Sequence, residues 1–407
     1  MFMMVFLLPA MMVSSSRACT VFYIYKDGRV LAASNEDWSD PNTKMWFYPA
    51  SADRHGWVKF GFAGGFPQAG MNDCGMFWDG TAGPYLGMPY SEENKILYDG
   101  PLMQKLMEEC SGIPDAIEVF DHYYCQDQYR AQYLVGGAAG YSMIVEGDNI
   151  IHNDYGFQVL TNFYQSEPEL GGYPCWRFDK AVEKLENCDS ITDYFMGTVL
   201  AATHQDGKYP TQYSLIFDPQ QSMIYLFYYH NYDEFLLIDL ADELAKDTSS
   251  YSIPPIFSRI KMIGPDNGTE ISSDSIVLKW RGLPGSSYEL VVSDGKSFHL
   301  QKAITAETAL QDPVSAPAYL IALLLPVVFF IRRRKASFFL LLLVSAMILV
   351  SCNKSDDEEP AVDPTVLMSE VVYGLEANKT YYWKIIATPQ NSKGFGTRSL
   401  TYSFKST

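Results

Sequence analysis

Short runs of β-branched and aromatic residues stand at both ends of the region from residue 19 to about residue 245, with helical patterns between them. Polar turns such as 26–28 and 218–219 separate the β-rich runs. This order of strands, helices and strands predicts an α+β domain of stacked layers rather than a parallel α/β sheet. The expected strands are 20–25, 30–33, 141–145, 214–217 and 223–229, and the expected helices are 101–109, 113–122, 178–185 and 191–202.

The chain changes character after a linker rich in serine and proline at residues 248–255. Beyond it, strand patterns recur around Trp280 and, much later, around Tyr381, which follows Leu375 with five residues between them. The tryptophan-bearing strand and the Leu-to-Tyr spacing resemble a fibronectin type III domain, with Tyr381 in its tyrosine-corner region. The resemblance implies a β-sandwich, and its two pieces are residues 256–302 and 366–407.

Residues 303–365 interrupt the expected sandwich. They contain two apolar segments, 316–331 and 336–351, which flank four consecutive cations at 332–335. Each segment is slightly shorter than the roughly 20 residues that a membrane-spanning helix needs. Three interpretations stay open: a membrane hairpin with its basic turn in the cytoplasm, an anchor followed by a lipobox-like sequence ending at Cys352, and a genetic insertion or sequence-assembly error that split the sandwich. We expect membrane association through this region rather than a buried soluble helix.

The first eighteen residues have the features of a secretory signal peptide. Residues 1–13 are apolar, and Ser16 and Ala18 occupy the −3 and −1 positions of a small-residue cleavage site. No lysine or arginine precedes the apolar run, which departs from the usual pattern. Cleavage after Ala18 would make Cys19 the first residue of the mature chain. We therefore expect an exported protein on the extracellular or periplasmic face of a membrane.

A cysteine at the N-terminus of a chain carries both a nucleophile and a base. Its α-amino group has a pKa of about 7.7–8.0, so much of it is neutral near pH 7 and can accept the thiol proton. The thiolate is the form that attacks a carbonyl group. Structural and lipidated cysteines also follow signal peptides, but residues 16–18 lack the leucine expected three positions before a lipidated cysteine.

The residues that follow Cys19 resemble the opening of the choloylglycine hydrolase and penicillin acyltransferase superfamily. Cys19 and Thr20 begin a strand, and a second strand ends at residues 34–38 (Ser-Asn-Glu-Asp-Trp). The resemblance implies the four-layer αββα Ntn-hydrolase fold for residues 19–247 and the cleavage of linear amides. Four further matches keep the family's order: 70–76 resembles a G-x-N-x-x-G turn, 159–162 a Thr-Asn segment, 176–178 a Ser-Arg-Phe helix start, and 211–226 a C-terminal hairpin.

The resemblance implies a role for each candidate catalytic residue. Cys19 would attack the amide carbonyl and form a thioester, and Asp37 would accept a hydrogen bond from the Cys19 amine. Asn162 would donate to the oxyanion, a contribution of about 3–4 kcal/mol in comparable sites, and Arg177 would organise the site. The candidate substrate-binding residues are Asn35, Asn72, Asp79 and Thr81.

Ser34 departs from the family, which usually carries an arginine immediately before the Asn-x-Asp element. Its presence implies a different substrate group, compensation by another cation, or reduced activity. Two alternatives therefore stay open beside the amide hydrolase: a Cys-dependent dipeptidase of a related Ntn family, and an inactive cell-surface binding protein. Acyl transfer to an amine in place of water also fits the family.

The formal net charge of −18 argues against a nucleic-acid partner, because phosphate binding needs a basic surface. The expected partner is a small-molecule amide with an apolar acyl group, such as a bile-salt conjugate, an N-acyl amine or a penicillin-type compound. The seven cysteines include no C-x-x-C pair and the six histidines show no metal-binding spacing, so we expect no metal and no cofactor. His204 and His230 are expected to be structural. In an exported chain the candidate disulfides are Cys110 with Cys125 and Cys175 with Cys188.

Overall fold

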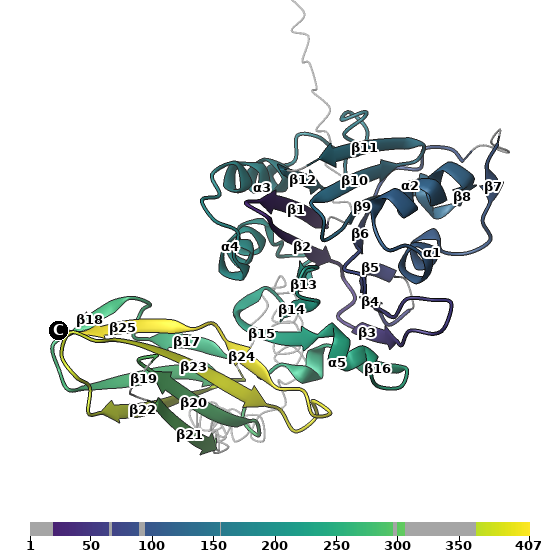
Figure 1. Cartoon of the computed structure of the whole chain (residues 1–407). Helices are drawn as coiled ribbons and strands as arrows, with labels where there is room; N and C mark the ends of the chain where they lie inside the picture. Colours follow the sequence, from purple (N-terminus) through teal and green to yellow (C-terminus); the bar gives the residue numbers. More distant parts are fainter. Residues whose placement is uncertain (1–18, 65–66, 89–93, 155, 296–298, 306–363) are drawn as a thin grey trace, which may run out of the picture.

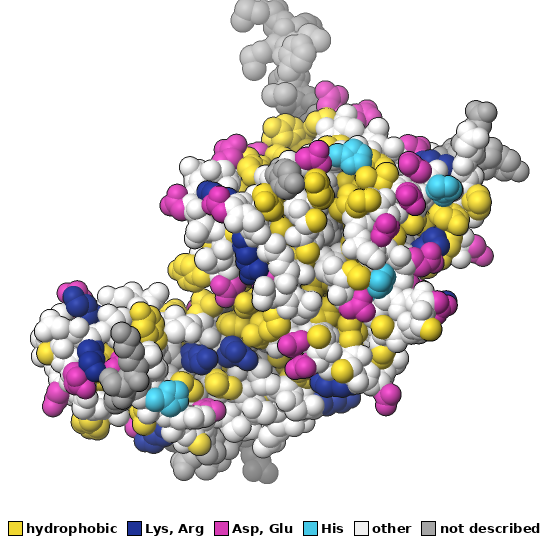
Figure 2. All heavy atoms as spheres, in the orientation of Figure 1, with side chains coloured by type: hydrophobic (Ala, Val, Ile, Leu, Met, Phe, Trp, Pro, Cys, Tyr) yellow, Lys and Arg dark blue, Asp and Glu magenta, His cyan; other side chains and the backbone are white. Residues whose placement is uncertain are grey.

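The structure is a computed structural model that describes residues 19–64, 67–88, 94–154, 156–295, 299–305 and 364–407 (Figure 1). The described part is mostly β-sheet with few helices. Strands β1 to β16 and the helices form an N-terminal domain, and strands β17 to β25 form a second body beside it (Figure 1). The two bodies are joined by pairing of β15 with β24. On the face drawn in Figure 2, acidic and basic side chains are interspersed over the N-terminal domain.

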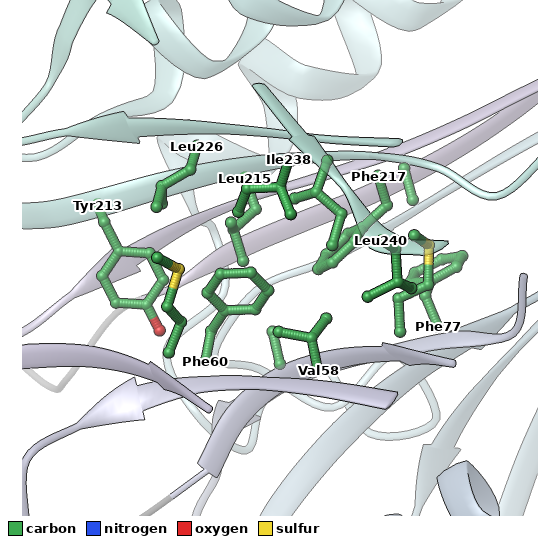
Figure 3. Packing of buried hydrophobic residues seen from close by; sticks show 14 of the residues in the cluster. Val58, Phe60, Phe77, Tyr213, Leu215, Phe217, Leu226, Ile238 and Leu240 are labelled. Carbon is green, nitrogen blue, oxygen red and sulfur yellow. The ribbon is translucent and has the colours of Figure 1, made fainter. Parts of the chain in front are cut away.

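Two antiparallel sheets lie face to face in the N-terminal domain. The first has the order β12-β1-β2-β13-β14-β15, and the second has the order β11-β10-β9-β6-β5-β4-β3-β16. Alternate residues of each strand point into the space between the sheets, where Phe60 of one sheet packs near Leu215 and Phe217 of the other (Figure 3).

The strands of the first sheet are β12 (Gly156–Leu160), β1 (Thr20–Lys26), β2 (Arg29–Asp37), β13 (Thr211–Asp218), β14 (Met223–Tyr228) and β15 (Asn231–Asp239). Those of the second are β11 (Asn149–Asp154), β10 (Tyr141–Glu146), β9 (Ala131–Gly136), β6 (Phe77–Ala82), β5 (Pro67–Asn72), β4 (Trp57–Phe62), β3 (Thr43–Tyr48) and β16 (Ser249–Ser252). A short parallel pair, β7 (Ile96–Leu97) and β8 (Tyr123–Tyr124), stands apart from both sheets.

Helices cover the outer face of each sheet. Helices α1 (Leu102–Glu109) and α2 (Ile113–His122) pack on the second sheet, and α3 (Trp176–Glu186) and α4 (Asp193–Thr203) pack on the first. All four begin within two residues of the starts predicted from apolar spacing. The layer order is therefore helices, sheet, sheet, helices. The remaining helical turns are η1 (Asp127–Tyr129), α5 (Leu240–Leu244) and η2 (Pro254–Ile256).

The C-terminal strands form a β-sandwich around its own apolar core. β22, which follows residues 306–363 in the chain, pairs with β19 along its whole length. The hydroxyl of Tyr381 accepts a hydrogen bond from the backbone N–H of Glu376 at 2.8 Å. The strands are β17 (Lys261–Gly264), β18 (Thr269–Ile271), β19 (Ser275–Gly282), β20 (Ser287–Ser293), β21 (His299–Thr305), β22 (Val366–Tyr373), β23 (Thr380–Thr388), β24 (Thr397–Ser399) and β25 (Tyr402–Ser406).

Glu234 joins the two bodies at the point where β15 pairs with β24. Its fully buried carboxylate accepts hydrogen bonds from the backbone N–H groups of Ser258 and Ile260, both at 2.8 Å, and from the Thr397 hydroxyl at 2.5 Å. Burial raises the pKa of Glu234 to about 7, although these hydrogen bonds lower it. One side chain therefore accepts hydrogen bonds from two segments at the junction, residues 258–260 and Thr397.

Several expectations lie outside the described residues. The signal peptide at 1–18, the apolar segments 316–331 and 336–351, and Cys352 all belong to parts of the chain that the structure does not describe. Within the described ranges, no helix combines the length and apolar character needed to cross a bilayer.

The structure contradicts the disulfide candidates. The four cysteines concerned are free thiols, and Cys110 and Cys125 are both buried in the apolar layer under α1 and α2. The thiols there serve as small apolar side chains, which is a common use of buried cysteine.

We predict that Glu234→Gln lowers the free energy of unfolding by about 1–3 kcal/mol, because an amide NH₂ would face an N–H or O–H donor in place of a carboxylate oxygen. Urea denaturation at pH 8 measures this. The matched control is Glu270→Gln on β18, where the glutamate is exposed, and we expect a change there within about 0.5 kcal/mol. Equal effects of the two substitutions would contradict the role given to Glu234.

Candidate active site

Cys19 lies at the open edge of the layer between the two sheets. It directly precedes β1, and the alternation of side chains along the strand places it on the same face as Val21 and Tyr23, which belong to the core between the sheets. The residue is only 5% exposed, and it forms part of the wall of a cavity of about 500 Å³. The thiol is therefore buried beside a space large enough for an organic substrate.

The cavity combines aromatic walls with charged groups. Trp38, Phe62 and Tyr133 contribute the aromatic surface, and Asp127 and Arg130 lie among its polar lining residues. Residues from β2, β4, β6 and β9 meet here, so both sheets contribute to the cavity. An apolar group with a polar end would fit this combination of surfaces.

Arg177 connects three segments around Cys19. Its Nη1 donates to the backbone oxygen of Cys19 at 2.6 Å and to the hydroxyl of Thr20 at 2.8 Å, and its Nη2 donates to Oδ1 of Asn162 at 3.2 Å. The guanidinium is buried at the start of α3, so its rigid fork fixes the beginning of β1 relative to the segment after β12. Nδ2 of Asn162 donates to the backbone oxygen of Ala82 at 2.8 Å.

Asp37 lies at the end of β2 and lines the cavity. Its Oδ1 accepts a hydrogen bond from the Thr211 hydroxyl at 2.5 Å, and its Oδ2 accepts one from Nε2 of Gln205 at 2.6 Å. Burial raises the pKa of Asp37 to about 8, while the charge of Arg177 and these two hydrogen bonds lower it. A carboxyl group with such a pKa exchanges its proton near neutral pH.

Glu36 lies within hydrogen-bond distance of the Cys19 thiol. The Cys19 Sγ donates to Oε2 of Glu36 at 3.4 Å. Burial raises the pKa of Glu36 to about 7, although the neighbouring Asp79, Cys19 and Ser34 side chains lower it. Burial and the neighbouring Glu36 raise the pKa of Asp79 well above its ordinary value. Two neighbouring buried carboxyl groups do not readily ionise together, so the pair keeps a proton at a pH where an exposed carboxyl group is ionised.

These neighbours keep the Cys19 thiol protonated. Burial raises its pKa well above the ordinary value, and the charges of Glu36 and Asp37 raise it further. In the uncleaved chain the nitrogen of Cys19 is an amide and carries no charge. A free α-ammonium group on the same residue would place a positive charge beside the thiol and lower its pKa.

The four candidate catalytic residues come together in the structure. Arg177 bonds to both Cys19 and Asn162 and interacts electrostatically with Asp37. Thr81, a candidate substrate-binding residue, lines the cavity, and its hydroxyl donates to the backbone oxygen of Thr161 at 2.8 Å.

The other three candidate substrate-binding residues do not line the cavity. Asp79 is fully buried beside Glu36. Asn35 points toward α4, where its Nδ2 donates to Leu200 and Thr203 and its Oδ1 accepts from Ser214. The side-chain amide of Asn35 is thus used within the fold, and the structure gives it a structural position in place of the expected one.

Asn72 also has a structural position. Its Nδ2 donates to the backbone oxygens of Met107 and Cys110 at the end of α1, and its Oδ1 accepts from the N–H groups of Cys74 and Met76. The motif that resembles G-x-N-x-x-G is therefore the turn between β5 and β6 that holds α1 in place.

Sequence reasoning did not select Glu36, Gln205 or Thr211. A signal for Glu36 was present, because this charged residue directly follows the apolar or neutral run from Val30 to Asn35. In a strand its side chain lies on the same face as that of Ser34. Gln205 and Thr211 belong to a loop and a strand far from Asp37 in the chain, and only the folded sheet brings them to it.

Comparison with known proteins gives a remote similarity only. No protein-family model and no curated protein sequence matches the chain. Among solved structures, a penicillin V acylase from Agrobacterium tumefaciens aligns with 57% of this chain and 91% of its own, at 15% identity and a TM-score of 0.44. A tetra-tandem repeat from the extending region of a large adhesion protein aligns with 95% of this chain and 72% of its own, at 8% identity and a TM-score of 0.13. At these values neither similarity assigns a role to any residue.

We predict that the free energy of unfolding falls as the pH rises from 5 to 8. Glu36 has a raised pKa of about 7 in the folded chain, so the unfolded chain loses this proton at lower pH than the folded chain does, and the folded state becomes relatively less stable over that interval. Glu36→Gln removes this titration and should flatten the decline by about 2 kcal/mol. Urea denaturation at pH 5, 6, 7 and 8 measures the slope.

Glu270→Gln is again the control, because its glutamate is exposed and should leave the slope as in the wild type. Parallel pH profiles for wild type and Glu36→Gln would show that Glu36 is already ionised in the folded chain at pH 5, contrary to the account of the site.

Proposed function

We propose that the mature chain is an amide hydrolase in which Cys19 is both the N-terminal residue and the nucleophile. The observation that carries this proposal is the position of the Cys19 thiol, buried at a cavity wall, with Asp37, Asn162 and Arg177 gathered around it. A cysteine used only for packing does not require a buried arginine bonded to its own backbone oxygen.

The reaction begins when removal of residues 1–18 releases the α-amino group of Cys19. The neutral amine accepts the thiol proton, and the sulfur attacks the carbonyl carbon of a linear amide. The tetrahedral intermediate collapses as the amine group of the enzyme protonates the leaving nitrogen, which gives a thioester and a free amine. The amine, neutral again, then takes a proton from a water molecule that attacks the thioester carbonyl. The C–S bond breaks, the carboxylic acid leaves, and the proton returns to the sulfur of Cys19.

The surrounding residues hold these groups in place. Arg177 fixes the backbone of Cys19 and the side chain of Asn162. Asn162 would donate to the oxyanion once its Nδ2 exchanges the backbone oxygen of Ala82 for the substrate. Asp37 would accept a hydrogen bond from the new amine, and its contacts with Thr211 and Gln205 set its orientation.

Glu36 tunes the thiol rather than replacing the amine as base. Its charge raises the pKa of Cys19, whereas the new α-ammonium group would lower it. The charge of Glu36 therefore keeps the Cys19 thiol protonated and unreactive until removal of the signal segment creates the α-amino group. Activity would then depend on a cleavage that also accompanies export.

The cavity favours an amide with an apolar acyl group. Trp38, Phe62 and Tyr133 offer aromatic surface to the acyl part, and Thr81 lies on the cavity wall beside Gly80 and Ala82. Bile-salt conjugates, N-acyl amines and penicillin-type compounds share this character. These features support membership in the choloylglycine hydrolase and penicillin acyltransferase superfamily, with acyl transfer as a related outcome, and the protein would act on the outer side of a membrane to which residues 316–351 attach it.

A binding protein without activity is the second candidate. The acidic groups beside the sulfur favour it, because Glu36 and Asp37 both raise the pKa of the nucleophile, and Ser34 stands where the family usually has a cation. In this case the cavity would bind the same class of ligand without cleaving it.

We predict that N-terminal sequencing of the exported protein begins at Cys19 and that this form hydrolyses N-acyl amides. The uncleaved chain should be inactive, because its Cys19 nitrogen is an amide and accepts no proton. Release of the free amine, followed with an amine-reactive dye, compares the two forms.

Cys19→Ala should be cleaved normally and lose hydrolysis by at least about 1,000-fold. Cys74→Ala is the matched control, because Cys74 is an exposed free thiol outside the cavity, and it should keep its activity. A mature chain that starts elsewhere, or an active Cys19→Ala variant, would contradict the proposal; ligand binding without hydrolysis would favour the second candidate.

A further inference from the structure

Two turns bring His204, Asp206 and His230 together outside the cavity. His204 directly follows α4, and His230 lies in the turn between β14 and β15. Nε2 of His204 lies 3.6 Å from Oδ2 of Asp206, and Nε2 of His230 lies 3.7 Å from Oδ1 of the same carboxylate. One potential ligand atom from each residue lies within 4.8 Å of the others.

These distances fit the ligands of a shared ion better than a set of hydrogen bonds. An N–H···O hydrogen bond places its heavy atoms about 2.7–3.2 Å apart. Tetrahedral zinc bonds of about 2.0–2.1 Å place neighbouring ligand atoms about 3.4 Å apart. The two imidazole rings lie nearly parallel, with an interplanar angle of 15° and centroids 5.1 Å apart.

The hydrogen bond on the other side of His204 favours metal binding. Nδ1 of His204 lies 2.7 Å from the backbone oxygen of Ala201, which accepts only if Nδ1 carries the hydrogen. Nε2, which lies 3.6 Å from Asp206, is then the ring atom left to bind a metal ion. Metal-binding histidines commonly use a backbone oxygen in this way to fix the ring and its tautomer.

A second cluster, formed by His55, Asp73 and Cys74, has a different geometry. Nδ1 of His55 lies 3.2 Å from Asp73, and its Nε2 lies 3.2 Å from the hydroxyl of Ser111. Both ring nitrogens are therefore at hydrogen-bond distance from partners within the protein. This cluster supplies a comparison of similar composition in the same chain.

We propose that His204, Asp206 and His230 bind one divalent transition-metal ion, with zinc as the best match, through the two Nε2 atoms and the carboxylate. Two imidazoles and one carboxylate form a typical three-residue zinc ligand set, and water would complete the coordination. The sequence alone predicted structural roles for the two histidines and no metal site, because residues 204 and 230 show no recognisable ligand spacing.

The ion would link the loop after α4, which carries His204 and Asp206, to the turn before β15, which carries His230. Gln205 lies between two of the ligands, and its side chain donates to Asp37 at 2.6 Å. Tyr209, further along the same loop, packs on Trp38, with ring centroids 6.2 Å apart. Metal binding would thus steady one wall of the cavity without touching a reacting group. The site depends on its own geometry and does not require the proposed hydrolase.

The test measures zinc bound by the full mature chain, purified without a histidine tag, after gel filtration from zinc-containing buffer. We expect about one zinc ion per chain in the wild type and loss of this zinc in His204→Asn/His230→Asn. The asparagine at 204 can still donate to the Ala201 oxygen but offers no Nε2. His55→Asn is the matched control and should retain the zinc.

Thermal unfolding gives an independent readout. Added zinc should raise the Tm of the wild type and of His55→Asn, because an ion that binds only the folded chain stabilises it, and should leave the double variant unchanged. The same stoichiometry in wild type and double variant, or loss of zinc in His55→Asn alone, would overturn the proposal. A wild type without zinc would overturn it too and reduce the cluster to an ion pair of Asp206 with protonated histidine.

Discussion

The buried contact between Arg177 and the first two residues of the described chain is the interaction on which the site depends. A guanidinium that donates to the Cys19 backbone oxygen, the Thr20 hydroxyl and Asn162 fixes where β1 begins. It also brings a positive charge near Asp37 in a region crowded with buried acidic groups. Without this cation, the burial of Glu36, Asp37 and Asp79 around one thiol would be far more costly.

The pleat of two adjacent strands decides what surrounds the sulfur. Residues 19, 21 and 23 of the first strand face the second sheet, and so do Ser34 and Glu36 of the neighbouring strand, whereas Asn35 faces α4. The thiol therefore meets Glu36 and not Asn35. The same alternation that builds the core thus places Glu36 beside the candidate nucleophile. Cleavage would create a positive α-ammonium group on Cys19, which would lower the pKa of the thiol and so oppose the effect of Glu36.

Much of this arrangement could be predicted from the sequence, and the reasons for the failures are physical. Apolar periodicity located the four main helices. The chemistry of an N-terminal cysteine pointed to Cys19, and the family resemblance pointed to Asp37, Asn162 and Arg177, which the fold brings together around it. Asn35 and Asn72 were misjudged because a motif does not tell whether a side-chain amide faces a cavity or the backbone of a helix. The His204 and His230 pair escaped notice because a helix end and a hairpin turn meet only in three dimensions. The apolar segments at 316–351 lie outside the described residues, so their role stays a prediction.

The most direct measurement of the central claim is rapid-quench mass spectrometry of the mature chain during hydrolysis of an N-acyl amide. Cys19 as nucleophile predicts a transient mass increase equal to the acyl group, located by peptide mapping to the N-terminal peptide and removed by hydroxylamine, as a thioester requires. Turnover of the amide with no acylated intermediate, or with the acyl group on another residue, would contradict it.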